Sequence, residues 1–308
     1  MSASHVPTSA CGHDHTPHDF GVAFAVGVGL NTAYVLSQVI FGIRANSVAL
    51  LADAGHNFGD VLGLLAAWTA SALVKRPPTE RRTYGLGSTS ILASLFNAVI
   101  LLVSVGGIGW EALQRLIQPA EVQSHLIIAV AAAGIFVNGI TAILFLRGKD
   151  HDLNLQGAFS HMAADALISA GVVVAGIAIM LTGWKWVDSV VSLLIAATVI
   201  SGTWNLLRKS MNLAMMGVPD GVDVPEVKQF LESLPGVEEA HDLHIWALST
   251  TDTALTAHLV MPAAGATDEF LHDLSFDLHR KFHIDHPTIQ IESGELAHAC
   301  HLAPDNVV

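Results

Sequence analysis

Six long apolar segments constrain the fold of this chain more than any other feature. They lie at about residues 20–43, 48–74, 88–117, 125–146, 158–181 and 187–207. Each is close to the roughly 20 residues that an α-helix needs to cross the hydrocarbon core of a bilayer. Backbone polar groups find no water there, so such a segment crosses as a helix. The sequence therefore predicts an all-α, six-helix transmembrane domain over residues 20–209.

The composition agrees with a membrane protein and excludes one class of partner. Of the 308 residues, 52% are hydrophobic and only 13% are charged, and the mean hydropathy is +0.52, a profile typical of integral membrane proteins. The formal net charge of −13 argues against nucleic acid, whose binding proteins carry basic patches. This charge suits the handling of cations, and it suits an acidic soluble surface equally well.

The positions of lysine and arginine predict the orientation in the membrane. One side of the six segments holds Lys75, Arg76, Arg81, Arg82, Arg147, Lys149, Arg208 and Lys209, and the other holds only Arg44, Arg115 and Lys185. The positive-inside rule then places both termini in the cytoplasm, and the N-terminus lacks the features of a secretory signal. Cys11 and Cys300 therefore fall in a reducing compartment, where metal binding is favoured over a disulfide.

The two ends of the chain are polar and differ from the apolar segments. Residues 1–19 are rich in histidine, and such a tract either captures soft metals or is a tail with incidental histidines. After residue 210, Asp223 followed by Pro225 indicates a helix start. We expect strands at 237–246 and 254–261, a helix at 268–282 and a short strand at 288–292. This αββαβ order predicts a small α+β domain over residues 210–295, followed by an irregular tail at 296–308.

Two of the apolar segments carry the same polar motif, His-x-x-x-Asp. It occurs as His56 with Asp60 and again as His161 with Asp165. Residues four apart share one face of a helix, so each segment offers an imidazole nitrogen and a carboxylate oxygen to one point. Two such helices supply a tetrahedral site for a divalent metal of the zinc type. Alternatively, each pair is an internal hydrogen bond between helices, but two identical spacings in separate segments favour the metal site.

A third acidic residue lies on the face of the second segment that carries His56 and Asp60. Asp53 is seven residues before Asp60 and nearer the predicted outer surface. Ionisable residues inside a membrane segment are costly and usually mark a substrate path. We interpret Asp53 either as an exit-path residue that accepts released metal or a proton, or as a cap near the interface.

These stretches resemble the cation diffusion facilitator family, in particular its zinc-transporting branch of bacterial efflux proteins and animal zinc transporters. The resemblance lies in residues 46–60 and 157–165, with support from Lys75-Arg-Pro-Pro, Arg82-Thr-Tyr-Gly, Gly183-Trp-Lys-Trp-Val-Asp and His241-Asp-Leu-His-Ile-Trp. It implies a homodimer in the bacterial inner or plasma membrane, with six spans per subunit and a metallochaperone-like cytoplasmic domain. It also implies export of Zn2+, with Co2+ or Cd2+ as further substrates, in exchange for protons.

The resemblance extends to individual metal ligands. His56, Asp60, His161 and Asp165 match the transport site of the family, and a histidine at position 56 favours zinc over cadmium. In the cytoplasmic domain, His241 and His258 can meet across adjacent strands and resemble family ligands, together with His272 and Glu292. A second candidate cluster contains His298, Cys300 and His301, which Cys11 and His13 of the N-terminal tract would complete. Zn2+ would then be both the substrate and a regulatory ligand.

The chemistry of the ligands suggests how exchange would work. Zinc needs neutral imidazole and ionised carboxylate, so it competes with protons for the site. Because a free histidine titrates near about pH 6.5, one site exposed alternately to two sides suffices for exchange. Two rival functions are a membrane-anchored metal sensor and an intramembrane zinc hydrolase. Catalytic zinc keeps an open position, whereas four protein ligands are present here, so we expect a transporter and no enzyme.

Overall fold

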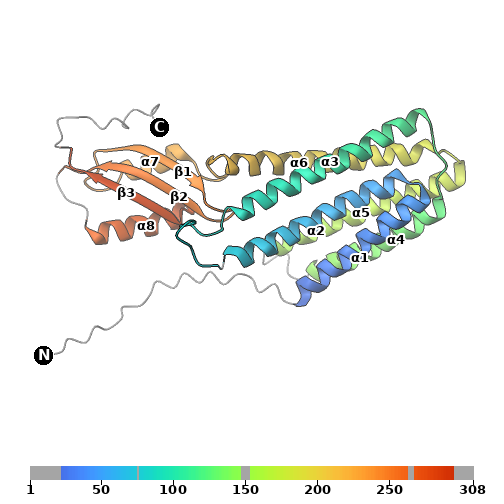
Figure 1. The fold of residues 1–308 in the computed structure, drawn as a ribbon, viewed down its shortest axis with the longest axis horizontal. Coiled ribbons are helices and arrows are strands. Elements are labelled where there is room, and N and C mark those ends of the chain that lie inside the picture. Colours follow the sequence, from blue (N-terminus) through green and yellow to red (C-terminus); the bar gives the residue numbers. More distant parts are fainter. Residues whose placement is uncertain (1–21, 75, 147–152, 263–266, 295–308) are drawn as a thin grey trace.

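The computed structural model describes residues 22–74, 76–146, 153–262 and 267–294. The N-terminal tract, the C-terminal tail and the second candidate cluster (His298, Cys300 and His301 with Cys11 and His13) lie outside these residues. A helical bundle forms one end of the molecule, and a domain with a small sheet forms the other (Figure 1).

In the described residues, six helices form the bundle. They are α1 (Val22–Ala45), α2 (Val48–Val74), α3 (Thr89–Ile117), α4 (Ser124–Leu146), α5 (Leu153–Thr182) and α6 (Trp186–Ala214). Four stretches of the described chain are long and apolar enough to cross a membrane: Thr89–Ile117, Ser124–Ile143, Phe159–Thr182 and Trp186–Ala214. Large apolar side chains such as Phe96, Val103 and Phe136 are exposed on the outside of the bundle, as expected of a lipid-facing surface. The chain is therefore a membrane protein.

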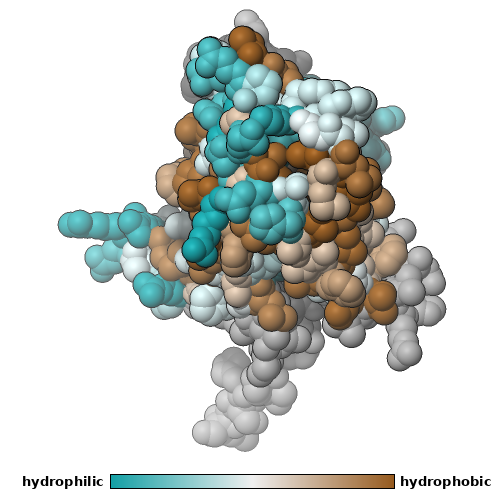
Figure 2. Space-filling view, turned by 90° about the vertical axis from the view of Figure 1, so that its right-hand side faces the viewer, coloured by the Kyte–Doolittle hydropathy of each residue, from teal (hydrophilic) through white to brown (hydrophobic). Residues whose placement is uncertain are grey.

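The end of the bundle away from the sheet carries both hydrophilic and hydrophobic residues at its surface, and hydrogen bonds fix the helix starts inside it. Figure 2 views this end, where hydrophilic residues lie among hydrophobic ones. Beneath it, the buried carboxylate of Asp188 at the start of α6 accepts hydrogen bonds from Ser47 Oγ and the backbone N–H of Val48. A carboxylate at a helix N-terminus satisfies an otherwise unpaired N–H and interacts favourably with the helix dipole. Asp188 thereby fixes the start of α2, the helix that carries His56 and Asp60.

The C-terminal domain contains α7 (Val224–Glu232), β1 (Glu239–Ala247), β2 (Thr253–Val260), α8 (Asp268–Phe282) and β3 (His286–Glu292). β1 pairs antiparallel with β2, and β2 pairs parallel with β3, so β2 is the central strand. One face of β2 presents Leu255, Ala257 and Leu259 to a buried core that α7 and α8 complete. His258 points to the other face, because successive side chains alternate across a strand.

The C-terminal domain contacts the bundle through the turn between β1 and β2. The backbone N–H of Thr250 donates to Ser90 Oγ at 3.0 Å, and Ser88 Oγ donates to the carbonyl of Leu248 at 3.3 Å. Ser88 and Ser90 lie at the start of α3. The turn that joins two strands of the sheet is therefore in direct contact with a helix of the membrane domain.

Candidate metal centres

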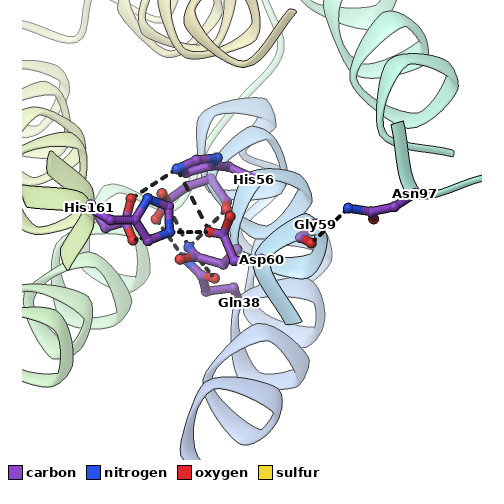
Figure 3. A network of polar contacts seen from close by, with 9 residues as sticks. Gln38, His56, Gly59, Asp60, Asn97 and His161 are labelled. Carbon is purple, nitrogen blue, oxygen red and sulfur yellow. Dashed lines mark hydrogen bonds and ion pairs between the residues drawn. The ribbon is translucent and has the colours of Figure 1, made fainter. Parts of the chain in front are cut away.

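The first candidate centre joins α2 and α5 inside the bundle. His56 Nε2 lies 2.9 Å from Asp165 Oδ1, and His161 Nε2 lies 3.4 Å from Asp60 Oδ2, so each histidine contacts the aspartate of the other helix. Within each helix, the His–Asp distances are 3.9 Å for α2 and 3.6 Å for α5. Figure 3 shows His161 directed from α5 toward His56 and Asp60 of α2. The structure thus brings together all four residues expected at the transport site.

The spacing of these atoms fits a tetrahedral zinc ion. Two ligand atoms at about 2.0–2.1 Å from the ion lie about 3.3 Å apart in a tetrahedron, and the four His–Asp separations are near that value, with Asp165 using Oδ1 toward His56 and Oδ2 toward His161. One ligand atom each of His56, Asp60 and Asp165 lies within 4.8 Å of the others, whereas His161 is outside that closer group and would have to move inward to complete a four-ligand site. Asp165 Oδ2 is buried and has no hydrogen-bond partner in the described part of the chain. A buried carboxylate oxygen without a partner is unfavourable, which indicates that a cation completes its environment.

The exposure of the four residues differs along the bundle. Asp165 is 2% exposed, whereas the side chain of His161, one turn nearer that domain, is 43% exposed. Asp60 is also partly exposed, and it too lies on the turn nearer the C-terminal domain. On the other side of the centre, Asp53 and Ser169 are fully buried. Exposure of these ligands is therefore greater on the turn nearer the C-terminal domain than on the turns beyond the centre.

Asp53 lies in a buried hydrogen-bond network between α1 and α2. Its Oδ2 atom accepts from Gln38 Nε2 at 2.5 Å, and Gln38 Nε2 also contacts the hydroxyl oxygen of Tyr34 at 3.0 Å. Asn57 Nδ2 contacts Gln38 Oε1 at 3.2 Å and the backbone carbonyl of Asp53 at 2.9 Å. Asp53 is thus well inside α2, and Asp188 is the residue that caps the start of that helix.

Tyr34 and Asn57 were not among the residues expected to be functional. Tyr34 and Gln38 are four residues apart on α1, and Asp53 and Asn57 are four apart on α2. Polar residues at that spacing share one helix face. The sequence signal for Tyr34 and Asn57 is therefore a pair of polar residues four apart within an apolar segment.

The second candidate centre lies on the sheet of the C-terminal domain. His241 of β1 pairs directly with His258 of β2, and Glu292 of β3 pairs with Val260, two residues along β2 on the face that carries His258. His258 Nδ1 is 3.1 Å and His241 Nε2 is 3.5 Å from the carboxylate of Glu292. One ligand atom from each of the three residues lies within 4.8 Å of the others.

The environment of His241 supports metal binding at this second centre. The residue is 3% exposed, and neither of its ring nitrogens has a hydrogen-bond partner among the described residues. Buried polar atoms are nearly always satisfied, and a metal ion shared with Glu292, whose carboxylate lies 3.5 Å from His241 Nε2, would satisfy this imidazole. Neutral imidazole and carboxylate in this arrangement are suitable donors for zinc.

The structure does not bring His272 to this centre. His272 is exposed on α8, whose buried residues Leu274 and Leu278 pack on the opposite face of the sheet. For a site built within one chain, the prediction that included His272 is therefore wrong. The position of His272 in the sequence does not show this. Which face of the sheet α8 covers depends on how the helix and the sheet pack together.

Comparisons with known proteins cover almost the whole described chain. A model of the cation efflux transmembrane domain matches residues 24–213, and a model of the cation efflux protein cytoplasmic domain matches residues 219–294. A metal cation efflux system protein of Cupriavidus metallidurans is 38% identical over 91% of this chain and 89% of its own. The zinc transporter ZitB of Escherichia coli is 33% identical over 95% and 93%. A cadmium, cobalt and zinc/H(+)-K(+) antiporter of Bacillus subtilis is 30% identical over 92% of each chain.

Proposed function

This chain belongs to the cation efflux, or cation diffusion facilitator, family, and from this premise we propose that it exports Zn2+ from the cytoplasm in exchange for protons. The observation that carries the proposal is the meeting of His56 and Asp60 on α2 with His161 and Asp165 on α5. Four zinc-type ligands between apolar helices of a membrane protein are costly to bury, and a cation that passes through accounts for them.

The proposed topology has α1–α6 all crossing the membrane, with both termini and the sheet domain in the cytoplasm. The distribution of lysine and arginine supports this orientation. In the resulting arrangement the partly exposed side of the α2–α5 centre faces the cytoplasm. We propose further that two copies associate, since the family resemblance implies a homodimer.

Proton exchange follows from the donor atoms of the α2–α5 centre. On the cytoplasmic side, neutral His56 and His161 and ionised Asp60 and Asp165 bind Zn2+. When the helices rearrange and the centre opens to the outside, protons compete for the imidazole nitrogens and weaken the hold on the metal. The same atoms serve both states, so a shift of α2 against α5 is sufficient for alternating access.

Two imidazoles and two carboxylates favour Zn2+ among the cations that such a site receives, and Co2+ accepts the same donors. The Cupriavidus metallidurans relative is named as a metal cation efflux system protein, and the Bacillus subtilis relative as a cadmium, cobalt and zinc/H(+)-K(+) antiporter. We therefore propose Zn2+ as the principal substrate and Co2+ or Cd2+ as further ones. In the proposed centre, four protein side chains fill the coordination sphere of one ion. Because catalytic zinc keeps an open position, we propose no catalytic role.

We assign Asp53 to the outward path. It lies on the side of the centre that is closed in this structure, where Gln38 and Asn57 hold its carboxylate between α1 and α2. A carboxylate there can receive the metal or a proton once the centre opens outward. His241, His258 and Glu292 would bind a second, regulatory Zn2+ in the cytoplasm.

Reconstituted protein provides the test. In proteoliposomes with an acidic lumen and a zinc-sensitive dye inside, the wild type should accumulate Zn2+, and a protonophore that collapses the pH gradient should stop it. Asp60→Ala should abolish accumulation. Asp273→Ala, which removes a carboxylate from the exposed side of α8, is the matched control and should transport normally. Equal transport by the wild type and Asp60→Ala would show that the α2–α5 centre is not the transport site.

A further inference from the structure

His258 is contacted on both of its ring nitrogens, by carboxylates from two different strands. Its Nδ1 atom faces Glu292 Oε1 at 3.1 Å, inside the candidate metal centre of the sheet. Its Nε2 atom faces Asp242 Oδ2 at 3.4 Å, on the side away from that centre. Only one nitrogen of a neutral imidazole has a free lone pair for a metal, so the partner of the other nitrogen decides which one binds.

Asp242 is held in this position by a second histidine. His244 Nε2 lies 2.9 Å from Asp242 Oδ1, a hydrogen-bond distance, which leaves Oδ2 directed toward His258. The side chain of Asp242 is only 11% exposed. A carboxylate that is this well buried needs hydrogen-bond donors, and its two oxygens each have a histidine nitrogen beside them.

The backbone at Asp242 is unusual, and the irregularity puts the side chain where it is. β1 contains a bulge between His241 and His244, so that three steps along β1 match two steps along β2. Asp242 lies in this bulge with φ of 48°, the left-handed region that few residues other than glycine adopt. A β-bulge redirects side chains relative to a regular strand. Here it allows two neighbouring residues, His241 and Asp242, to approach the same imidazole from different sides.

We propose that Asp242 is a positioning residue of the cytoplasmic metal centre, which orients His258 without touching the metal. Asp242 accepts the Nε2–H of His258, so that Nδ1 keeps its lone pair and points at the ion shared with His241 and Glu292. His244 in turn anchors Asp242. Metal-binding histidines usually donate their second N–H to such a carboxylate, which fixes the ring and raises its basicity. This inference rests on the proposed binding of metal by the sheet centre. It assigns to Asp242 the role of setting the affinity of that centre for the metal ion.

The test uses the full-length protein in detergent, with the transport site disabled by Asp60→Ala and His161→Ala in every sample. Titration with Co2+, followed by its visible absorption, and competition with Zn2+ then report the remaining sites. His241→Ala identifies the binding event that belongs to the sheet. If His241→Ala leaves the titration unchanged, the sheet does not bind metal and the regulatory part of the proposed function is wrong.

Asp242→Asn and Asp242→Gly test the positioning role. Asparagine and glycine both tolerate the left-handed backbone at this position, so both variants should fold, which thermal unfolding of the metal-free proteins checks. We expect Zn2+ at the His241-dependent site to bind about 10- to 100-fold more weakly in both, as is typical when an outer-shell carboxylate is removed. Asp285→Asn, which alters the carboxylate beside His279 at 3.1 Å, is the matched control and should bind as its parent does.

Two outcomes would overturn the proposal while the sheet site stands. In the first, both Asp242 variants bind Zn2+ as tightly as their parent does, while His241→Ala abolishes binding at the sheet site. The other is loss of a separate equivalent of metal in the Asp242 variants with the His241-dependent event unchanged, which would make Asp242 a ligand of its own site with His244.

Discussion

His56 Nε2 and Asp165 Oδ1 lie 2.9 Å apart although 109 residues separate them in the sequence. They belong to α2 and α5, which otherwise have few contacts with each other compared with α4 and α5 or α3 and α6. A metal site at a sparsely packed helix pair has a physical advantage for transport. The two helices can shift relative to each other with little loss of packing, as the proposed alternating access requires.

Removal of the buried ligand should stop transport. Asp165→Asn keeps the size of the side chain but replaces a carboxylate oxygen with a weaker donor. We expect at least a 100-fold loss of Zn2+ affinity at the α2–α5 centre, since even outer-shell changes typically lose about 10- to 100-fold. Isothermal titration of protein that carries His241→Ala, followed by vesicle transport, checks this. Parental affinity in Asp165→Asn would contradict the assignment of Asp165.

The first histidine should set the preference between metals. His56→Asp replaces an imidazole with a carboxylate, and the expectation rests on the family resemblance, which links this exchange to broader transport of cadmium. We expect the ratio of Cd2+ to Zn2+ transport rates to rise about tenfold, a change of about 1.4 kcal/mol in relative affinity. Parallel uptake assays with the two metals in the same vesicle preparation measure the ratio. An unchanged ratio would show that position 56 does not determine selectivity.

Gly59 allows α2 and α3 to approach closely beside the transport site. A Cβ atom at this position would lie 2.4 Å from Leu101 Cδ2, far inside contact distance. Gly59→Ala should therefore destabilise the bundle by about 1–3 kcal/mol, as overpacking usually does. Thermal unfolding in detergent measures this, and Gly106→Ala on α3, where a Cβ would meet no atom within 4 Å, is the control.

A second substitution tests whether contact with Leu101 causes the instability expected of Gly59→Ala. Leu101→Ala combined with Gly59→Ala removes the clash and should recover part of the lost stability. If the double variant unfolds at a lower temperature than either single variant, the clash with Leu101 is not the cause.

The contact between the sheet domain and α3 should depend on Ser90. Its hydroxyl oxygen accepts the backbone N–H of Thr250 at 3.0 Å, and Ser90→Ala leaves that N–H without its partner. We expect a loss of about 1 kcal/mol at this contact, seen as roughly fivefold faster amide exchange at Thr250. Thr89→Ala, whose hydroxyl bonds within its own turn to Leu86, is the neighbouring control. Unchanged exchange in Ser90→Ala would exclude the docking role.

The local elements of this fold could be read from the sequence where short-range chemistry determines them. The α8 helix runs from Asp268 to Phe282 as its pattern predicts, with Thr267 as the N-cap. β3 begins at His286, two residues before the predicted start. The strand includes Pro287, which pairs with Leu255. β3 is an edge strand of the sheet, where a missing N–H is tolerated.

The sequence by itself determined that His56 and Asp60 share a helix face, as do His161 and Asp165, because the 3.6-residue period is a property of one helix. It also showed that these faces lie in apolar segments. Ionisable residues in such segments usually mark a substrate path, so the sequence favoured a transport site for a metal ion. Only the tertiary structure decided that each histidine contacts the aspartate of the other helix, that Asp53 is closed off by Gln38, and that His272 lies away from His241 and His258. Those contacts depend on how helices and sheet pack, and packing joins residues that no local pattern connects.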